Sequence, residues 1–131
     1  MHKSDEIISD MATLSVQVIQ YVELKRVPYA VKDQLIRAVS SVGVSYNDAQ
    51  NAPNKKEFLH KVYSARKASS EAKYWLELIE KLVGKNEEST QLAKDIHGFY
   101  MMMQKIINTT KETASTRAKK TTVRELAKVM G

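Results

Sequence analysis

The sequence has no cysteine, and only two prolines and four glycines occur in its 131 residues. Without cysteine the chain has no disulfide, thiolate nucleophile or sulfur ligand for a metal. No apolar run approaches the roughly 18 residues that a membrane span needs, so we expect no membrane segment. The first residues carry acidic groups and do not resemble a signal peptide, so we expect a cytoplasmic protein.

Helix-forming residues, chiefly Ala, Leu, Lys, Glu and Met, are plentiful, so the composition favours helices. Apolar residues recur at alternating spacings of four and three, which keeps one face of a helix apolar. Four separate stretches show this pattern: Ile7 to Tyr21, Leu35 to Ala49, Phe58 to Val83 and Leu92 to Ile106. Each stretch predicts one amphipathic helix.

Residues that start or stop helices separate the four stretches. Pro28 cannot continue a helix from the preceding turn, and Asn54 with Glu57 three residues later resembles a capping box. Gly84 suits a helix C-terminus, and Asn86 suits the next N-terminus. We therefore predict helices near 4–26, 29–51, 54–83 and 86–112.

The short connections between these helices favour antiparallel neighbours. The predicted fold is an all-α, antiparallel up-down four-helix bundle over residues 1–112. A basic C-terminal tail, which we expect to be flexible, would follow over residues 113–131.

The formal net charge of +6 is unevenly spread along the chain. Residues 25–73 contain ten basic and four acidic residues, and residues 111–131 contain six basic and two acidic residues. On the third predicted helix, several cations lie in two lines about 100° apart, away from the apolar stripe. With one residue of the second helix, they form a set that we call the basic sector: Arg37, Lys55, Lys56, Arg66, Lys67 and Lys73. Two interpretations stay open, a solvated face and a binding site for RNA or DNA phosphates.

The third predicted helix has a second apolar face. Trp75, Leu78 and Leu82 lie well away from its main stripe. A contact between subunits of a homo-oligomer would cover them, and an aromatic anchor favours this interpretation. Wider wrapping by the fourth helix is the alternative.

Gly43 conflicts with its surroundings, because a glycine inside a helix costs about 1 kcal/mol relative to alanine. Close approach of another helix would account for it. A bend in the helix and tolerated drift are the alternatives.

Patterns that carry chemistry are missing. His2, His60 and His97 have no partner at a metal-binding spacing, and the helix stripes contain no carboxylate. Neither a phosphate-binding glycine loop nor a nucleophile elbow occurs. We therefore expect no metal, no cofactor and no enzymatic activity.

The stretch from residue 33 to residue 78, DQLIRAVSSVGVSYNDAQNAPNKKEFLHKVYSARKASSEAKYWLEL, carries a recognisable pattern. It resembles the four-helix bundle family named for proteins encoded in 23S rRNA intervening sequences. The matching positions are Gln34, Leu35, Arg37, Ser41, Val42, Gly43, Tyr46, Ala49, Phe58, Lys61, Glu71, Tyr74, Trp75, Leu76 and Leu78. The departures are Ser45 for the usual Asn, Asn47 for a frequent Arg and Asp48 for the usual Glu.

That family is also similar to the accessory variability determinants of diversity-generating retroelements. The resemblance implies a homopentamer, an RNA or DNA partner, and a protein partner such as a reverse transcriptase. Two hypotheses follow: a homo-oligomeric bundle that binds nucleic acid through the basic sector, or a protein-interaction scaffold without a nucleic-acid ligand.

Overall fold

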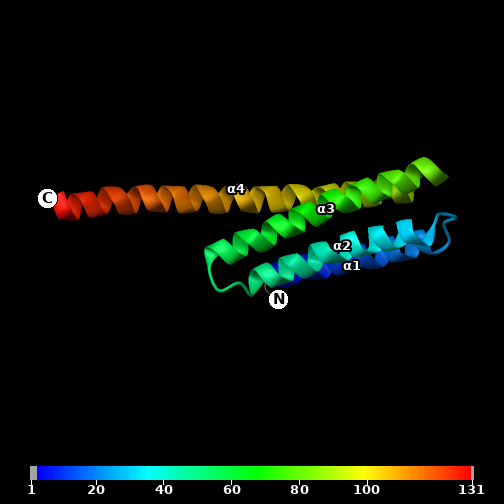
Figure 1. Ribbon diagram of the computed structural model, residues 1–131, viewed down its shortest axis with the longest axis horizontal. Helices are drawn as coiled ribbons and strands as arrows, with labels where there is room; N and C mark the ends of the chain where they lie inside the picture. The colour runs from blue at the N-terminus through cyan, green and yellow to red at the C-terminus, as the bar shows by residue number, and fades with distance from the viewer. Residues whose placement is uncertain (1–2, 131) are drawn as a thin grey trace.

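Four helices make up the chain in the computed structural model, which describes the backbone of residues 3–130 and the side chains as far as Glu112. They are α1 (Lys3–Glu23), α2 (Tyr29–Gln50), α3 (Lys55–Val83) and α4 (Glu87–Met130). Each helix runs opposite to the one before it, so sequence neighbours lie side by side (Figure 1). The all-α prediction is confirmed. Within residues 3–130, no helix combines the length and the apolar character that crossing a membrane requires.

The helices begin within one residue of the predicted positions, and α2 and α3 also end there, whereas α1 ends at Glu23, three residues before its predicted end. Pro28 immediately precedes α2. The Asn54 side chain accepts a hydrogen bond from the Glu57 backbone N–H at 2.9 Å and so caps α3. Gly84 ends α3 with a φ of 91°, a conformation that favours glycine. The Asn86 side chain accepts from the Ser89 backbone N–H at 2.7 Å, which caps α4.

The apolar stripes meet in two core clusters that follow one another along the bundle. The first cluster joins the second half of α1 and of α3 to the first half of α2 and of α4, and it contains Val18, Leu35, Leu76 and Ile96. The second contains Met11, Tyr46, Val62 and Met103. Among the described side chains of α4, Ile107 is the last buried one, while Ile106, the predicted core residue, is half-buried.

The seam between α1 and α4 is the least closed part of the bundle. Helix α2 packs along both α1 and α3, and α3 also packs along α4. By contrast, α1 meets α4 over a short contact. An apolar groove lies open there, lined by Ile7, Tyr46, Met101, Met102 and Ile106. Its charged lining residues are Lys3 and Lys105. The bundle is therefore open along this side.

The last helix is longer than predicted. We expected it to end near residue 112, but α4 continues to Met130 and extends beyond the start of α3 (Figure 1). Residues 113–130 contain no proline or glycine, so nothing in the local sequence stops the helix. The flexibility of residues 113–131 stays a prediction, and their side chains lie outside the described residues.

Among the side chains that the structure describes, one carboxylate is buried, against the expectation that the helix core contains none. Glu80 of α3 accepts a hydrogen bond from the Ser89 hydroxyl of α4 at 2.9 Å. The buried Tyr21 hydroxyl of α1 forms no hydrogen bond of good geometry. Burial raises the pKa of Tyr21, the charge of Glu80 raises it further, and the Ser89 hydroxyl opposes the rise. Polar groups of three helices thus lie near one another at one end of the core, and the Ser89–Glu80 hydrogen bond joins two of these helices.

Candidate nucleic-acid interface

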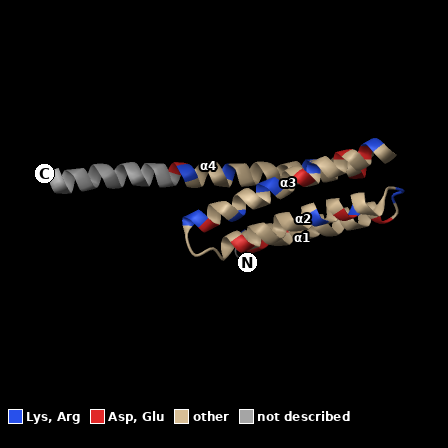
Figure 2. Cartoon of the chain, in the orientation of Figure 1, with Lys and Arg blue, Asp and Glu red and all other residues tan. Residues whose placement is uncertain are grey.

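Five of the six residues of the basic sector lie on α3. Lys55 and Lys56 occupy its first turn, and Lys67 lies near its middle. The side chains of all three are exposed. In Figure 2, Lys and Arg appear as blue segments at the start and in the middle of α3. The helix therefore presents positive charge over more than half of its length.

Arg66 is half-buried at the boundary between α3 and α4. Its Nη1 donates a hydrogen bond to Oε1 of Gln104 at 2.6 Å. The guanidinium also lies over the ring of Tyr63, with Cζ at 4.9 Å from the ring centroid, a distance typical of a cation–π contact. The partners of this cation are an amide and an aromatic ring, and both are uncharged.

A second cation reaches the same ring from α4. The Nζ atom of Lys111 lies 5.1 Å from the centroid of Tyr63. The sequence places Lys111 in a charged C-terminal stretch and does not by itself pair it with Tyr63. Predicting this contact requires the register in which α3 and α4 run antiparallel, and apolar spacing does not give that register.

Lys73 continues this arrangement toward the other end of α3. Its Nζ lies 3.2 Å from Nδ1 of His97 on α4. Because an ammonium group has no lone pair, it donates here and Nδ1 accepts. The imidazole in turn lies nearly parallel to the ring of Tyr100, with centroids 6.1 Å apart and an interplanar angle of 14°.

These residues form one surface feature that crosses both helices. We call it the cation–aromatic strip: Tyr63, Arg66, Lys73, His97, Gln104 and Lys111. None of its three cations pairs with a carboxylate among the described residues. Their positive charge is therefore held in place without being neutralised.

Arg37 differs from the other members of the basic sector. It lies on α2, and its Nε donates to Oδ2 of Asp33 at 2.7 Å. This hydrogen bond and the charge of Asp33 raise the pKa of Arg37 above its ordinary value. Its side chain is 73% exposed, but its charge is balanced locally. The structure thus separates Arg37 from the uncompensated cations of α3.

The second apolar face of α3 is partly covered by its own subunit. Trp75 is half-buried against the first core cluster, and its ring meets that of Tyr74 edge to face at 5.3 Å. Leu78 is half-buried. Leu82 and Tyr74 are 57% and 58% exposed. The fourth helix does not wrap this face completely.

Gly43 faces α1. A Cβ atom built there would lie 3.5 Å from Cβ of Met11, which is an ordinary van der Waals contact. The two helices do pack together at this point, but a methyl group would fit. Close packing within the chain therefore does not require a glycine.

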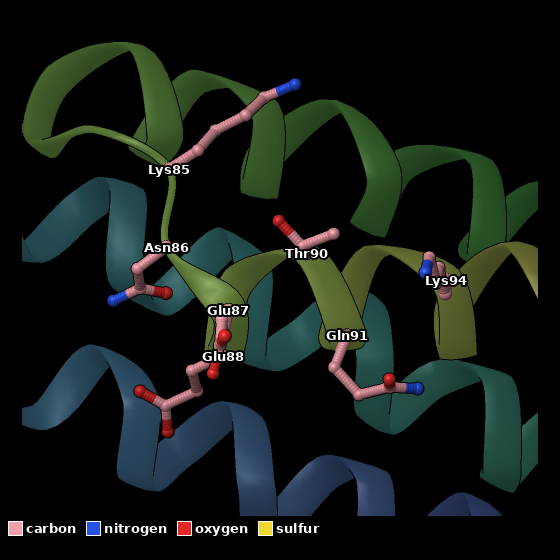
Figure 3. Close-up of a pocket in the computed structure, with 7 residues that line it drawn as sticks. All are labelled: Lys85, Asn86, Glu87, Glu88, Thr90, Gln91 and Lys94. Atoms are coloured by element: carbon pink, nitrogen blue, oxygen red, sulfur yellow. The ribbon is translucent and has the colours of Figure 1, made fainter.

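The turn between α3 and α4 forms an open, polar depression. Its lining includes Lys85, Glu87, Glu88 and Lys94, and their charged groups do not converge on a common point (Figure 3). The Asn86 oxygen there is already used to cap α4. Within the described residues, no three His, Asp or Glu side chains are arranged to hold a metal ion.

The fold and the strip define an all-α four-helix bundle protein with a cationic surface feature on its last two helices. The chain belongs to the 23S rRNA-intervening sequence protein family, whose model matches residues 3–109. The family resemblance of the stretch 33–78 is thereby confirmed, and it extends over most of the bundle.

A solved structure supports the same fold. The chain is similar to a protein of unknown function from the S23 ribosomal protein family of Bacteroides thetaiotaomicron VPI-5482, with a TM-score of 0.73 and 20% identity. The match covers 82% of this chain and 99% of that one. No curated protein matches. At this identity the likeness concerns the fold.

Proposed function

We propose that the chain is a non-enzymatic, homo-oligomeric bundle that binds RNA or DNA through phosphate groups. The observation that carries the proposal is the set of neutral partners around Arg66, Lys73 and Lys111. Cations held by an amide, an imidazole and a ring keep their charge available to a polyanion. The exposed side chains of Lys55, Lys56 and Lys67 add to the same field.

Binding of this kind is mainly electrostatic, because phosphate contacts release condensed counterions. The affinity should fall steeply between about 50 and 200 mM salt. Fluorescence anisotropy with labelled RNA and DNA, titrated at both salt concentrations, measures this. Tight binding that ignores salt, or no binding at the lower salt, would contradict the proposal.

A pair of charge-matched variants sharpens the test. Replacing Arg66 by Gln should weaken binding and flatten its salt dependence. Replacing Arg37 by Gln should change binding much less, because Asp33 already balances its charge. Equal losses in the two variants would show that net charge, not the position on α3, governs binding.

The homo-oligomer is the second part of the proposal, and the family resemblance favours a pentamer. The exposed Leu82 and Tyr74 support a contact on α3, because apolar groups on a surface gain from burial in an interface. Multi-angle light scattering of the purified protein gives the number of subunits. A monomer at all concentrations would remove this part of the proposal.

A protein-interaction scaffold is the second candidate, favoured by the apolar groove between α1 and α4. A polypeptide partner, such as the reverse transcriptase that the resemblance implies, would then bind without nucleic acid. Partner binding that survives neutralisation of Arg66 and Lys67, in a protein that binds neither RNA nor DNA, would support the scaffold. The cytoplasmic location stays a prediction in both cases.

A further inference from the structure

Aromatic rings lie beside cations at both ends of the cation–aromatic strip. On α4, His97, Gln104 and Lys111 are separated by seven residues each and therefore share one face of the helix. Their backbone positions span about 21 Å at 1.5 Å per residue. On α3, Lys73 lies beside His97, and Arg66 lies beside Gln104, in antiparallel register.

Two cations lie close to the ring of Tyr63: Cζ of Arg66 is 4.9 Å and Nζ of Lys111 is 5.1 Å from the ring centroid. A phosphate that either cation holds is therefore close to the ring. A base of the same or the next nucleotide can then stack on the ring, while the cation turns from the ring to the phosphate. Rings accept any base because every base has a π-face.

We propose that the strip binds single-stranded nucleic acid in preference to duplex, with cations on the phosphates and Tyr63 stacked against an unpaired base. This inference rests on the proposed function and adds the strandedness of the ligand. Stacking needs bases that are free of pairing partners. A duplex offers phosphates to the same cations but has no base to place on the ring.

The amides of the strip fit such a ligand. Gln104 accepts from Arg66 and donates from Nε2 to Oδ1 of Asn108 at 2.9 Å. Amides at this position can exchange these hydrogen bonds for bonds to the edge of an unstacked base. The strip therefore holds the three kinds of group that a single strand uses: cations, rings and amides.

Replacement of the Tyr63 ring tests the inference. Tyr63→Leu removes the ring and keeps an apolar side chain, whereas Tyr63→Phe keeps the ring. Affinity for a single strand should fall about tenfold in Tyr63→Leu, as expected for one lost stacking contact. Affinity for the duplex of the same sequence should stay within about twofold, a change too small to represent a lost contact. Tyr63→Phe should match the unmodified protein for both ligands.

A matched control is Tyr29→Leu, which removes an exposed tyrosine from α2, outside the strip. It should bind both ligands as the unmodified protein does. Equal losses for single strand and duplex in Tyr63→Leu would overturn the inference and leave electrostatic binding intact. A protein that binds neither ligand at low salt would remove the proposed function as well.

An oligonucleotide of abasic residues provides a second test, and its main comparison needs only the unmodified protein. It carries the phosphates of a single strand but no bases. The unmodified protein should bind it about tenfold more weakly than the normal strand, and Tyr63→Leu should not weaken that binding further. Equal affinity for the two strands in the unmodified protein would overturn the inference, because binding would then depend on the phosphates alone.

Discussion

Arg66 of α3 donates a hydrogen bond to the Gln104 side chain of α4 at 2.6 Å, so a cation is positioned by an uncharged group of the adjoining helix. A carboxylate at position 104 would occupy the same place. It would form an ion pair with the guanidinium and compete with any phosphate. The identity of this one residue therefore sets how much of the Arg66 charge is available.

Gln104→Glu should weaken nucleic-acid binding without unfolding the bundle. If one phosphate contact is lost, the slope of log K against log salt should decrease in magnitude by about 0.7 for single strands and about 0.9 for duplex. Anisotropy titrations over a series of salt concentrations give the slope. The control is Gln20→Glu, the same charge change at an exposed position of α1. An unchanged slope in Gln104→Glu would show that Arg66 contacts no phosphate.

Ser89→Ala should destabilise the fold. The hydroxyl donates to Glu80 at 2.9 Å and accepts from the Asn86 backbone N–H at 3.0 Å. Its removal leaves a buried carboxylate without this partner, which costs about 1–3 kcal/mol. Urea unfolding followed by circular dichroism measures the loss. Thr90→Ala, at the exposed neighbouring position, should change the free energy of unfolding by less than about 0.5 kcal/mol.

Tyr21 should make the fold sensitive to alkaline pH. Burial, with the charge of Glu80 adding to it, raises the pKa of Tyr21 in the folded state above the ordinary value of 10.0. The unfolded chain then loses the phenolic proton first, so stability is lost as pH rises from about 10 through the folded pKa. Below about 10 this contribution is fully present.

Tyr21→Phe should therefore lose less stability than the unmodified protein when pH rises from neutral to about 11. At neutral pH the variant should be as stable or slightly more stable, because the buried hydroxyl lacks a well-formed hydrogen bond. Thermal melts at each pH give the comparison, and Tyr29→Phe at an exposed position serves as the control. If stability fell equally with pH in Tyr21→Phe and in the unmodified protein, Tyr21 would not be the cause of the alkaline sensitivity.

The sequence predicted the parts of the fold that depend on neighbours along the chain. Apolar spacing correctly placed Leu35, Val39, Val42, Tyr46 and Ala49 in the core, and all five are buried. Capping chemistry correctly placed the ends at Asn54 and Gly84. Both signals act within a few residues, so a single sequence contains them completely.

Contacts between helices were not predictable in the same way. The pairing of Tyr63 with Lys111 and of Lys73 with His97 depends on the register of two antiparallel helices. Glu80 was missed as a buried residue for the same reason, because its partner Ser89 lies beyond the turn. The predicted end of α4 near residue 112 was wrong. Residues after 112 lack the apolar stripe by which a helix is predicted, but they also lack a helix breaker, so the helix continues.

Gly43→Ala should stabilise the bundle by about 0.5–1 kcal/mol, because alanine loses less backbone entropy than glycine in a helix. The new methyl group would make an ordinary contact with Met11 at 3.5 Å. Gly98→Ala, where a Cβ atom would have no neighbour within 4 Å, should give a similar gain. Chemical denaturation compares the two. A loss in Gly43→Ala alone would indicate that another subunit packs closely against that position.

Leu82→Gln should lower the mass of the assembly in solution. Leu82 is 57% exposed near the end of α3, and Tyr74 on the same helix is 58% exposed. Covering a leucine side chain in an interface contributes about 1.5–3 kcal/mol, so its loss should weaken each contact by about tenfold or more. Light scattering over a range of protein concentrations measures the shift. Val44→Gln makes the same change at an exposed apolar position of α2 and should leave the mass unchanged. A mass that falls in Val44→Gln but not in Leu82→Gln would place the subunit contact on α2 instead of α3.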